Sequence, residues 1–199
     1  RECSLQRRYQ KIVEVAPAAH LDPGLRGEII EAALKLARSV RYTNIGTFEF
    51  LVQGGQPGRP GRFAFIEANA RLQVEHTVTE QVTGVDICAA QIQLAGGATL
   101  RDLGLDTPGV REPRGRAIQA RVNMETLQAD GTVKPSGGLL TAYDAPGGPG
   151  VRVDGCGYTG YETSPSFDSL LAKVAATLGT RPAPPSTRSS PRLRLHWVR

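Results

Sequence analysis

The chain has 199 residues, enough for one or two domains with a hydrophobic core, and a formal net charge of +5. Residues 181–199 hold five arginines and no acidic residue, so the rest of the chain carries 19 basic and 19 acidic residues. This balanced body argues against a nucleic-acid-binding face, and no apolar run approaches the roughly 20 residues of a membrane-spanning helix. We therefore expect neither nucleic acid nor a membrane as a partner.

Cysteine and histidine positions indicate the cellular compartment. Cys3, Cys88 and Cys156 are odd in number and lack C-x-x-C spacing, which predicts free thiols in a reducing cytoplasm. The three histidines are scattered along the chain and predict no zinc site. No signal peptide is visible, and the sequence starts at Arg1 inside a strand-like pattern. We expect a cytoplasmic protein of which this chain is a fragment.

The first half of the sequence alternates between strand and helix patterns. A strand is expected over residues 9–15, and apolar spacing after Asp22-Pro23 predicts an amphipathic helix over 23–40. Strands over 46–53 and 62–68 flank a Gly- and Pro-rich loop, which predicts a hairpin. A short helix or turn over 79–84 and a helix over 85–95, closed by two glycines, follow.

The second half of the sequence shows short strand patterns rather than alternating strands and helices. Strand candidates at 117–122, 139–142, 151–153 and 170–175 lie between Gly- and Pro-rich turns, which indicates an antiparallel β subdomain. The predicted organisation is a lobe over 1–105, a linker over 106–114, a subdomain over 115–178 and a loose basic tail over 179–199.

A row of polar side chains stands out in the middle of the chain. Glu67, Asn69 and Arg71 alternate with alanines, so an extended backbone would place them on one face, and Gln73 and Glu75 continue the alternation. The hairpin would bring a further carboxylate, from residue 49, close to Glu67. Two carboxylates and an amide oxygen suit Mg²⁺, although a half-buried strand can also present such a face to water alone.

The same stretch carries a resemblance to a known family. Residues 65–80 and 82–86 resemble the signature of biotin carboxylases, which are ATP-grasp enzymes within biotin-dependent carboxylases. Residues 1–11, 115–123 and 164–174 resemble other landmarks of that family, in family order. The resemblance implies an α+β fold: the C-terminal lobe of an ATP-grasp domain followed by a small antiparallel β-rich biotin carboxylase C-terminal subdomain.

The resemblance also implies substrates and site residues. Biotin carboxylases use ATP, Mg²⁺ (or Mn²⁺) and bicarbonate to carboxylate biotin on a carrier, through carboxyphosphate. The positions that match metal ligands are Glu49, Glu67 and Asn69. The positions that match nucleotide neighbours are Gln6, Tyr9, Lys11, Leu51 and Ile66, together with Glu49 and Glu67. Tyr9 stands where the family often has His or Asn, so it departs from the family pattern at a position expected to contact the ribose or the adenine base.

The implied catalytic group surrounds bicarbonate and biotin. Lys11, Arg71, the Gln73 amide and the Val74 backbone N–H match the bicarbonate pocket, and Glu75 matches the general base. Arg121 matches the arginine that stabilises the biotin enolate.

The resemblance implies partners as well. They are a biotin carboxyl carrier protein or domain and a carboxyltransferase subunit or domain, and family members commonly form homodimers. The expected product feeds acyl-CoA carboxylation, for example of acetyl-CoA in fatty acid biosynthesis, although the sequence does not name the acceptor.

Two alternatives remain at this point. A carbamoyl-phosphate synthase also combines ATP with bicarbonate, but its motif lacks the run Gln73–His76 and needs no biotin arginine. An inactive or interaction-only fragment is the other, because the family's glycine-rich phosphate loop lies upstream of the matching region. We expect the isolated chain to be inactive.

Overall fold

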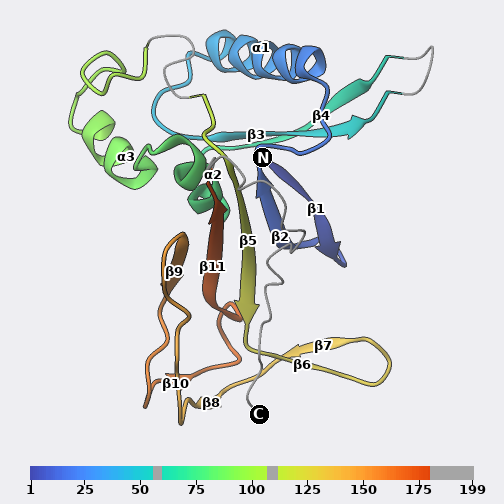
Figure 1. Cartoon of the computed structure of the whole chain (residues 1–199), viewed down its shortest axis with the longest axis vertical. Coiled ribbons are helices and arrows are strands. Elements are labelled where there is room, and N and C mark those ends of the chain that lie inside the picture. Colours follow the sequence, from blue (N-terminus) through green and yellow to red (C-terminus); the bar gives the residue numbers. More distant parts are fainter. Residues whose placement is uncertain (56–59, 107–111, 180–199) are drawn as a thin grey trace, which may run out of the picture.

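The computed structural model describes residues 1–55, 60–106 and 112–179 (Figure 1). All but the first residue of the predicted tail 179–199 lies outside them, as do parts of the predicted linker and of the loop between the hairpin strands. The elements are β1 (Glu2–Arg7), β2 (Gln10–Ala16), α1 (Pro23–Ser39), β3 (Thr47–Gln53), β4 (Arg62–Asn69), α2 (His76–Thr83), α3 (Ile87–Ala95), β5 (Arg116–Asn123), β6 (Glu125–Leu127), β7 (Val133–Pro135), β8 (Gly138–Leu139), β9 (Val151–Gly155), β10 (Glu162–Thr163) and β11 (Leu170–Leu178).

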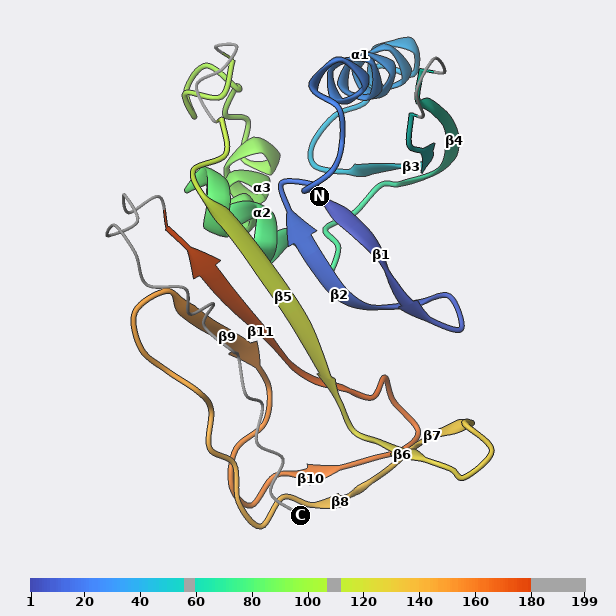
Figure 2. The same ribbon diagram turned by 45° about the vertical axis from the view of Figure 1, so that its right-hand side comes forward.

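A five-stranded antiparallel sheet forms the centre of the molecule, in the order β1-β2-β5-β11-β9. It joins the first 16 residues to the strands that follow residue 115, so one sheet runs across the predicted division between lobe and subdomain (Figure 2). β1 and β2 are joined by Arg8 and Tyr9, both with positive φ, as a tight hairpin turn requires. The short strands β6, β7 and β10 were not expected from the sequence.

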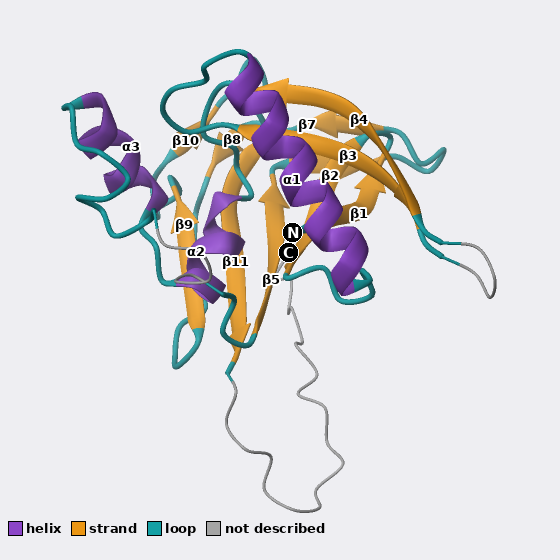
Figure 3. Ribbon diagram, turned by 90° about the horizontal axis from the view of Figure 1, so that it is seen from above, coloured by secondary structure: helices purple, strands orange, loops and turns teal. Residues whose placement is uncertain are grey.

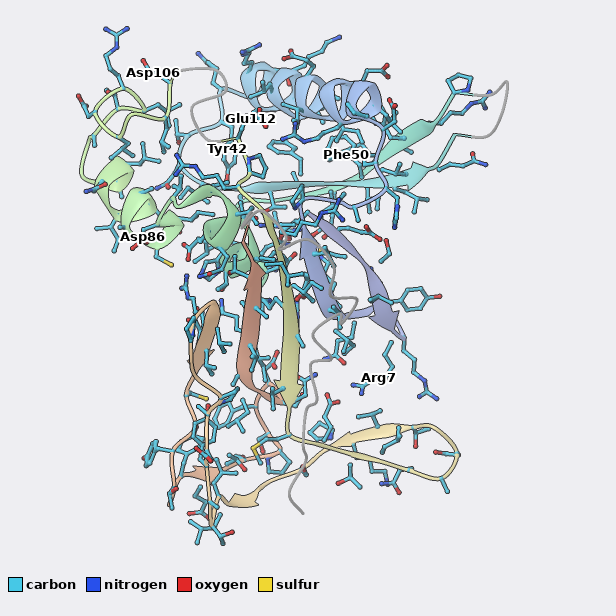
Figure 4. All side chains as sticks on the ribbon, viewed as in Figure 1. Arg7, Tyr42, Phe50, Asp86, Asp106 and Glu112 are labelled. Carbon is cyan, nitrogen blue, oxygen red and sulfur yellow. The ribbon has the colours of Figure 1, made fainter. Side chains whose placement is uncertain are left out.

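The predicted hairpin is confirmed as β3 paired antiparallel with β4. One face is aromatic: Phe50 packs edge-on against Phe63 and Phe65, and Tyr42 packs edge-on against Phe48. Figures 1 and 2 show α1 lying over the hairpin, and Figure 4 places the labelled Tyr42 and Phe50 on the side of β3 that faces this helix. The aromatic face is therefore used for packing, which leaves the opposite face for polar groups.

A β-bulge in this hairpin decides which way the acidic side chains point. Phe50 pairs with Phe65, but Glu49 pairs with Glu67, so Ile66 has no partner residue on β3. Without the extra residue, strand alternation would place Glu67 on the aromatic face with Phe65. The bulge moves Glu67 to the same face as Glu49, away from α1.

The helices α2 and α3 follow the hairpin and lie at the upper end of the sheet in Figure 1; seen from above, α2 is next to β11 and α3 lies farther out (Figure 3). α2 packs against β2, β5 and β11, and the core cluster Ala16, Val78, Val82 and Ala117 joins it to β2 and β5. Gly84, with φ +69°, ends α2, and the Asp86 side chain caps α3 by accepting from the Ala89 N–H at 2.8 Å. The mixed α+β architecture with antiparallel sheets agrees with the fold expected from the sequence. No helix among the described residues is long and apolar enough to cross a membrane.

Candidate functional site

Lys11, Glu49 and Glu75 form a charged cluster between the hairpin and the sheet, with Lys11 at its centre. Its Nζ donates to Glu49 Oε1 at 2.7 Å and to Glu75 Oε1 at 2.8 Å. Burial opposes the charge of the lysine, but its hydrogen bonds to the two carboxylates raise its pKa above the ordinary value. Lys11 therefore stays cationic at neutral pH and joins β2 to the hairpin and to the start of α2.

Glu75 is the most enclosed acid of this cluster, with 2% of its surface exposed. Its second oxygen, Oε2, accepts from Arg121 at 3.1 Å. Burial alone would raise the pKa of Glu75, but the hydrogen bond from Lys11, its own backbone N–H and the positive charge of Lys11 hold the pKa below the ordinary value. The carboxylate is thus ionised at neutral pH and held between two cations.

Glu49 also belongs to an acidic pair with Glu67, because the bulge places both side chains on one face of the hairpin. Asn69 Nδ2 donates to Glu67 Oε1 at 2.8 Å and lies 3.4 Å from Glu49 Oε1. Burial disfavours ionisation of Glu49, but donors from Lys11 and Gln73 lower its pKa. The hydrogen bonds to these two carboxylates within the described residues all fall on Oε1 atoms, which leaves each Oε2 free for a cation.

This donor set fits the predicted Mg²⁺ or Mn²⁺ ligands, since hard cations take carboxylate and amide oxygens. Asn69 presents its NH₂ group to the carboxylates, so it would have to turn its amide to offer oxygen to a metal.

The polar row is not one extended segment, and that prediction was wrong. β4 ends at Asn69, and the His76 N–H donates to the Gln73 carbonyl at 3.1 Å in a turn that leads into α2. Glu75 is therefore the N-cap residue of that helix rather than a strand residue. Gln73 still reaches the cluster, because its Nε2 donates to Glu49 Oε1 at 2.8 Å. A turn has brought these side chains together where alternation was expected to do so.

Three other predicted residues make no hydrogen bond to the cluster's carboxylates within the described part of the chain. Gln6 pairs with Lys11 across β1 and β2, and its side chain donates to the Cys3 carbonyl. The Val74 carbonyl accepts from Lys173 Nζ at 3.0 Å. Arg71 is exposed and donates only to the neighbouring Leu72 carbonyl among the described residues.

Three predicted nucleotide neighbours are open to solvent. Tyr9 is 98% exposed in the β1–β2 turn, and Leu51 and Ile66 are 68% and 55% exposed on the hairpin. Their roles stay predictions.

The sequence did not single out Glu14, which is fully buried and lies directly behind Arg121. Arg121 donates to Glu14 Oε1 through Nε at 2.7 Å, and Gln119 Nε2 donates to Glu14 Oε2 at 2.9 Å. An isolated carboxylate among Ile12, Val13 and Val15 was the available signal, because a buried acid requires partners. Glu14 fixes the guanidinium from one side while Glu75 holds it from the other.

Two family models match parts of this chain. Residues 1–103 match the model of the carbamoyl-phosphate synthase L chain, ATP binding domain, and residues 119–187 match the biotin carboxylase C-terminal domain. The chain belongs to the biotin carboxylase family. The second match runs past residue 178, where the subdomain expected from the sequence ends.

Named relatives and solved structures support the assignment. Pyruvate carboxylase of Aspergillus niger is 48% identical over 174 residues, covering 87% of this chain and 14% of that protein. Human mitochondrial pyruvate carboxylase is 48% identical over 177 residues, covering 88% and 14%. A single-chain long-chain acyl-CoA carboxylase structure superimposes with a TM-score of 0.83 at 48% identity, covering 89% of this chain and 18% of that one. The biotin carboxylase domain of a single-chain bacterial carboxylase gives a TM-score of 0.77 at 50% identity, covering 89% and 38%.

The chain spans about one seventh of the length of these pyruvate carboxylases.

Proposed function

We propose that the protein containing this chain uses ATP and bicarbonate to carboxylate biotin on a carrier, and that the charged cluster carries part of that reaction. One observation supports this most strongly: the buried carboxylate of Glu75 is held between Lys11 and Arg121. That arrangement combines a base with two cations, which is what the deprotonation and carboxylation of anionic reactants require.

The acidic pair Glu49 and Glu67 would bind the metal ion that accompanies ATP. Phosphoryl transfer needs metal ions that neutralise the negative charge of the phosphate oxygens, and a bound Mg²⁺ or Mn²⁺ would supply that neutralisation. Glu49 and Glu67 would hold it through their free oxygens, with Asn69 as a third ligand. Leu51 and Ile66 would contact the adenine base of ATP from the exposed part of the hairpin. Gln6 on β1 and Tyr9 in the β1–β2 turn would be further neighbours of the nucleotide.

The bicarbonate pocket would be built around Lys11 and the turn after β4. Arg71, free of ion pairs among the described residues, can turn its planar guanidinium toward an anion, and the Gln73 amide and Val74 N–H would complete the pocket. Glu75 would take the bicarbonate proton. Its pKa is low in this structure, and an anion brought next to it would raise that pKa toward the range of a working base.

Arg121 would act on the other substrate. Its guanidinium reaches Glu75 while Glu14 anchors it from behind, so its remaining N–H groups can stabilise negative charge that develops on the biotin ring. The proton acceptor and the enolate-stabilising group would thus lie within one hydrogen bond of each other.

The final acceptor and the assembly are broader questions than this site. The named relatives are pyruvate carboxylases and one solved neighbour is a long-chain acyl-CoA carboxylase, so acetyl-CoA and fatty acid biosynthesis are narrower than the comparisons support. A carrier, a carboxyltransferase and a homodimer are proposed partners by analogy with the family.

A cytoplasmic location is likewise proposed, although the human relative is described as mitochondrial. The isolated chain is expected to be inactive, because it covers 38% of the solved biotin carboxylase domain.

The direct test is to assay the parent protein for ATP cleavage that depends on bicarbonate, with free biotin or ammonia as the second substrate. Carboxybiotin formation without carbamoyl phosphate is the expected result. Ammonia-dependent carbamoyl phosphate formation without carboxybiotin would overturn the proposal in favour of the carbamoyl-phosphate synthase alternative.

A further inference from the structure

A second group of ligand-type side chains lies between α2 and α3, outside the charged cluster. One ligand atom from each of His76, Glu80 and Cys88 lies within 4.8 Å of the other two. His76 and Glu80 are four residues apart on α2 and so share a face, and Cys88 comes from the first turn of α3. The labelled Asp86 in Figure 4 marks the start of that helix. Zinc-type spacing is not visible in the sequence, because these residues meet only through the packing of the two helices.

The imidazole of His76 is already set up as a ligand. Its Nδ1 lies 2.7 Å from the Gln73 carbonyl, which can only accept, and 3.5 Å from Lys173 Nζ, which can only donate. The much shorter contact assigns the proton to Nδ1. In the neutral ring Nε2 then has a free lone pair, and it lies 3.6 Å from Cys88 Sγ. A histidine that donates its other ring N–H to a carbonyl is the usual outer-shell arrangement of metal-binding histidines.

Glu80 can supply the third donor without losing its present contacts. Its Oε1 accepts from the Ile87 N–H and its Oε2 accepts from Arg152, each at 2.7 Å. A carboxylate oxygen has two lone pairs, so either oxygen can also face a cation. Two cations, Arg152 and Lys173, balance two carboxylates, Glu80 and Asp154, because both cations also pair with Asp154. A site with little surplus negative charge but sulfur and nitrogen donors favours a soft or borderline cation over Mg²⁺ or Ca²⁺.

We propose that His76 Nε2, Cys88 Sγ and one Glu80 oxygen bind a thiophilic divalent cation of the Zn²⁺ class, with water as the fourth ligand. Zinc bonds of about 2.0–2.3 Å place tetrahedral donors roughly 3.3–3.8 Å apart. His76 Nε2 and Cys88 Sγ, at 3.6 Å, already meet this spacing, and a donor pair at the 4.8 Å limit would have to close by about 1 Å. The exposed Cys88 side chain can make this adjustment by rotation. On binding, the thiol loses its proton to solvent and the thiolate sulfur forms the bond to the metal.

The proposed ion would link α2 to α3 and immobilise the imidazole that holds the Gln73 carbonyl. That turn carries Glu75 into the charged cluster, so the metal would stiffen the support of the cluster without entering it. The inference does not depend on the proposed function, because it concerns binding alone.

The test is a titration of Co²⁺ into the full chain followed by absorption spectroscopy, with Zn²⁺ as the competitor. One equivalent should give tetrahedral Co²⁺ bands and a thiolate-to-cobalt charge-transfer band, both removed by Zn²⁺. Cys88→Ser, which alters an exposed side chain, should abolish the charge-transfer band and weaken Co²⁺ binding at least about tenfold. Circular dichroism should show that this variant keeps its fold.

Cys156→Ser and Cys3→Ser are the matched controls, because both remove a thiol elsewhere in the fold. They should bind Co²⁺ and show the band like the unsubstituted chain. The proposal fails if the unsubstituted chain shows no charge-transfer band. It also fails if the band survives in Cys88→Ser or disappears in either control.

Discussion

Arg121 and Glu14 form a buried ion pair whose closest atoms, Arg121 Nη2 and Glu14 Oε1, are 2.6 Å apart. The glutamate is fully buried, and the arginine side chain is 14% exposed. Because β2 pairs with β5, the two residues lie together although 107 positions separate them in the sequence. The pair fixes the arginine that reaches Glu75, so it connects the centre of the sheet to the charged cluster.

Removing Glu14 should therefore be costly. Glu14→Ala leaves a nearly buried guanidinium with one fewer partner, and breaking a buried ion pair in this way typically costs about 3–5 kcal/mol of unfolding free energy. Urea unfolding measures this loss. Glu28→Gln, an exposed position on α1, is the control and should stay within about 0.5 kcal/mol of the unsubstituted chain. An equally small effect of Glu14→Ala would show that the pair does not support the sheet.

Glycine positions test how the hairpin packs against α1. A Cβ on Gly61 would lie 2.7 Å from Leu25 Cδ2 and 3.2 Å from the Gln53 carbonyl oxygen, so Gly61→Val should cost about 1–3 kcal/mol through overpacking. A Cβ on Gly27, inside α1, would meet no atom of the described residues within 4 Å. Gly27→Ala should therefore raise the unfolding free energy by about 0.5–1 kcal/mol. The melting temperature should fall for Gly61→Val and rise for Gly27→Ala, and a shift in the same direction for both variants would contradict this packing.

The low pKa values of Glu49 and Glu75 predict how stability depends on pH. Both carboxyls have folded pKa values below the ordinary 4.5, so their contribution is complete above that pH and is lost as the pH falls through the folded values. Lys11→Met removes the cation that lowers both pKa values, so stability should fall less steeply between pH 5 and about pH 3.5. Urea unfolding at a series of pH values gives the slopes. Parallel curves for the variant and the unsubstituted chain would rule out Lys11 as the cause.

Glu67→Gln tests the acidic pair separately from stability. The Glu67 side chain is exposed and accepts one hydrogen bond among the described residues, so the substitution should change the unfolding free energy by about 0.5 kcal/mol or less. In the parent protein it should nevertheless weaken Mn²⁺ binding in the presence of ATP, measured by electron paramagnetic resonance. Unchanged Mn²⁺ affinity would remove Glu67 from the proposed metal ligands.

Local patterns predicted much of the fold. Helix α1 and the hairpin follow from apolar periodicity and turn composition over a few residues, and both are present close to the expected bounds. The bulge at Ile66 depends on pairing between two strands, which a single strand's alternation does not encode. β6, β7 and β10 are two or three residues long, too short to show a period.

The site divides in the same way. Glu49 and Glu67 could be placed near each other from the hairpin, because one loop joins the two strands directly, but their shared face depends on the bulge. Glu14 and Arg121 come from distant segments, and Cys88 meets His76 only when α3 packs beside α2. Those contacts depend on tertiary structure, and no spacing in the sequence carries them.

The central claim is that Glu75 and Arg121 act on different reactants in the same site. In the parent protein, Glu75→Ala should reduce bicarbonate-dependent ATP cleavage and biotin carboxylation together, because both would need the base. Arg121→Ala should reduce carboxylation more than ATP cleavage, because negative charge on biotin develops only after carboxyphosphate has formed. Loss of one preorganised charge partner typically costs about 10²–10³ in rate.

Phosphate release and carboxybiotin formation, measured side by side for Arg121→Ala, test this most directly. The account predicts continued phosphate release with carboxybiotin lowered by about 10²–10³-fold, from a variant whose circular dichroism is unchanged. Equal loss of both products from the folded variant would contradict it.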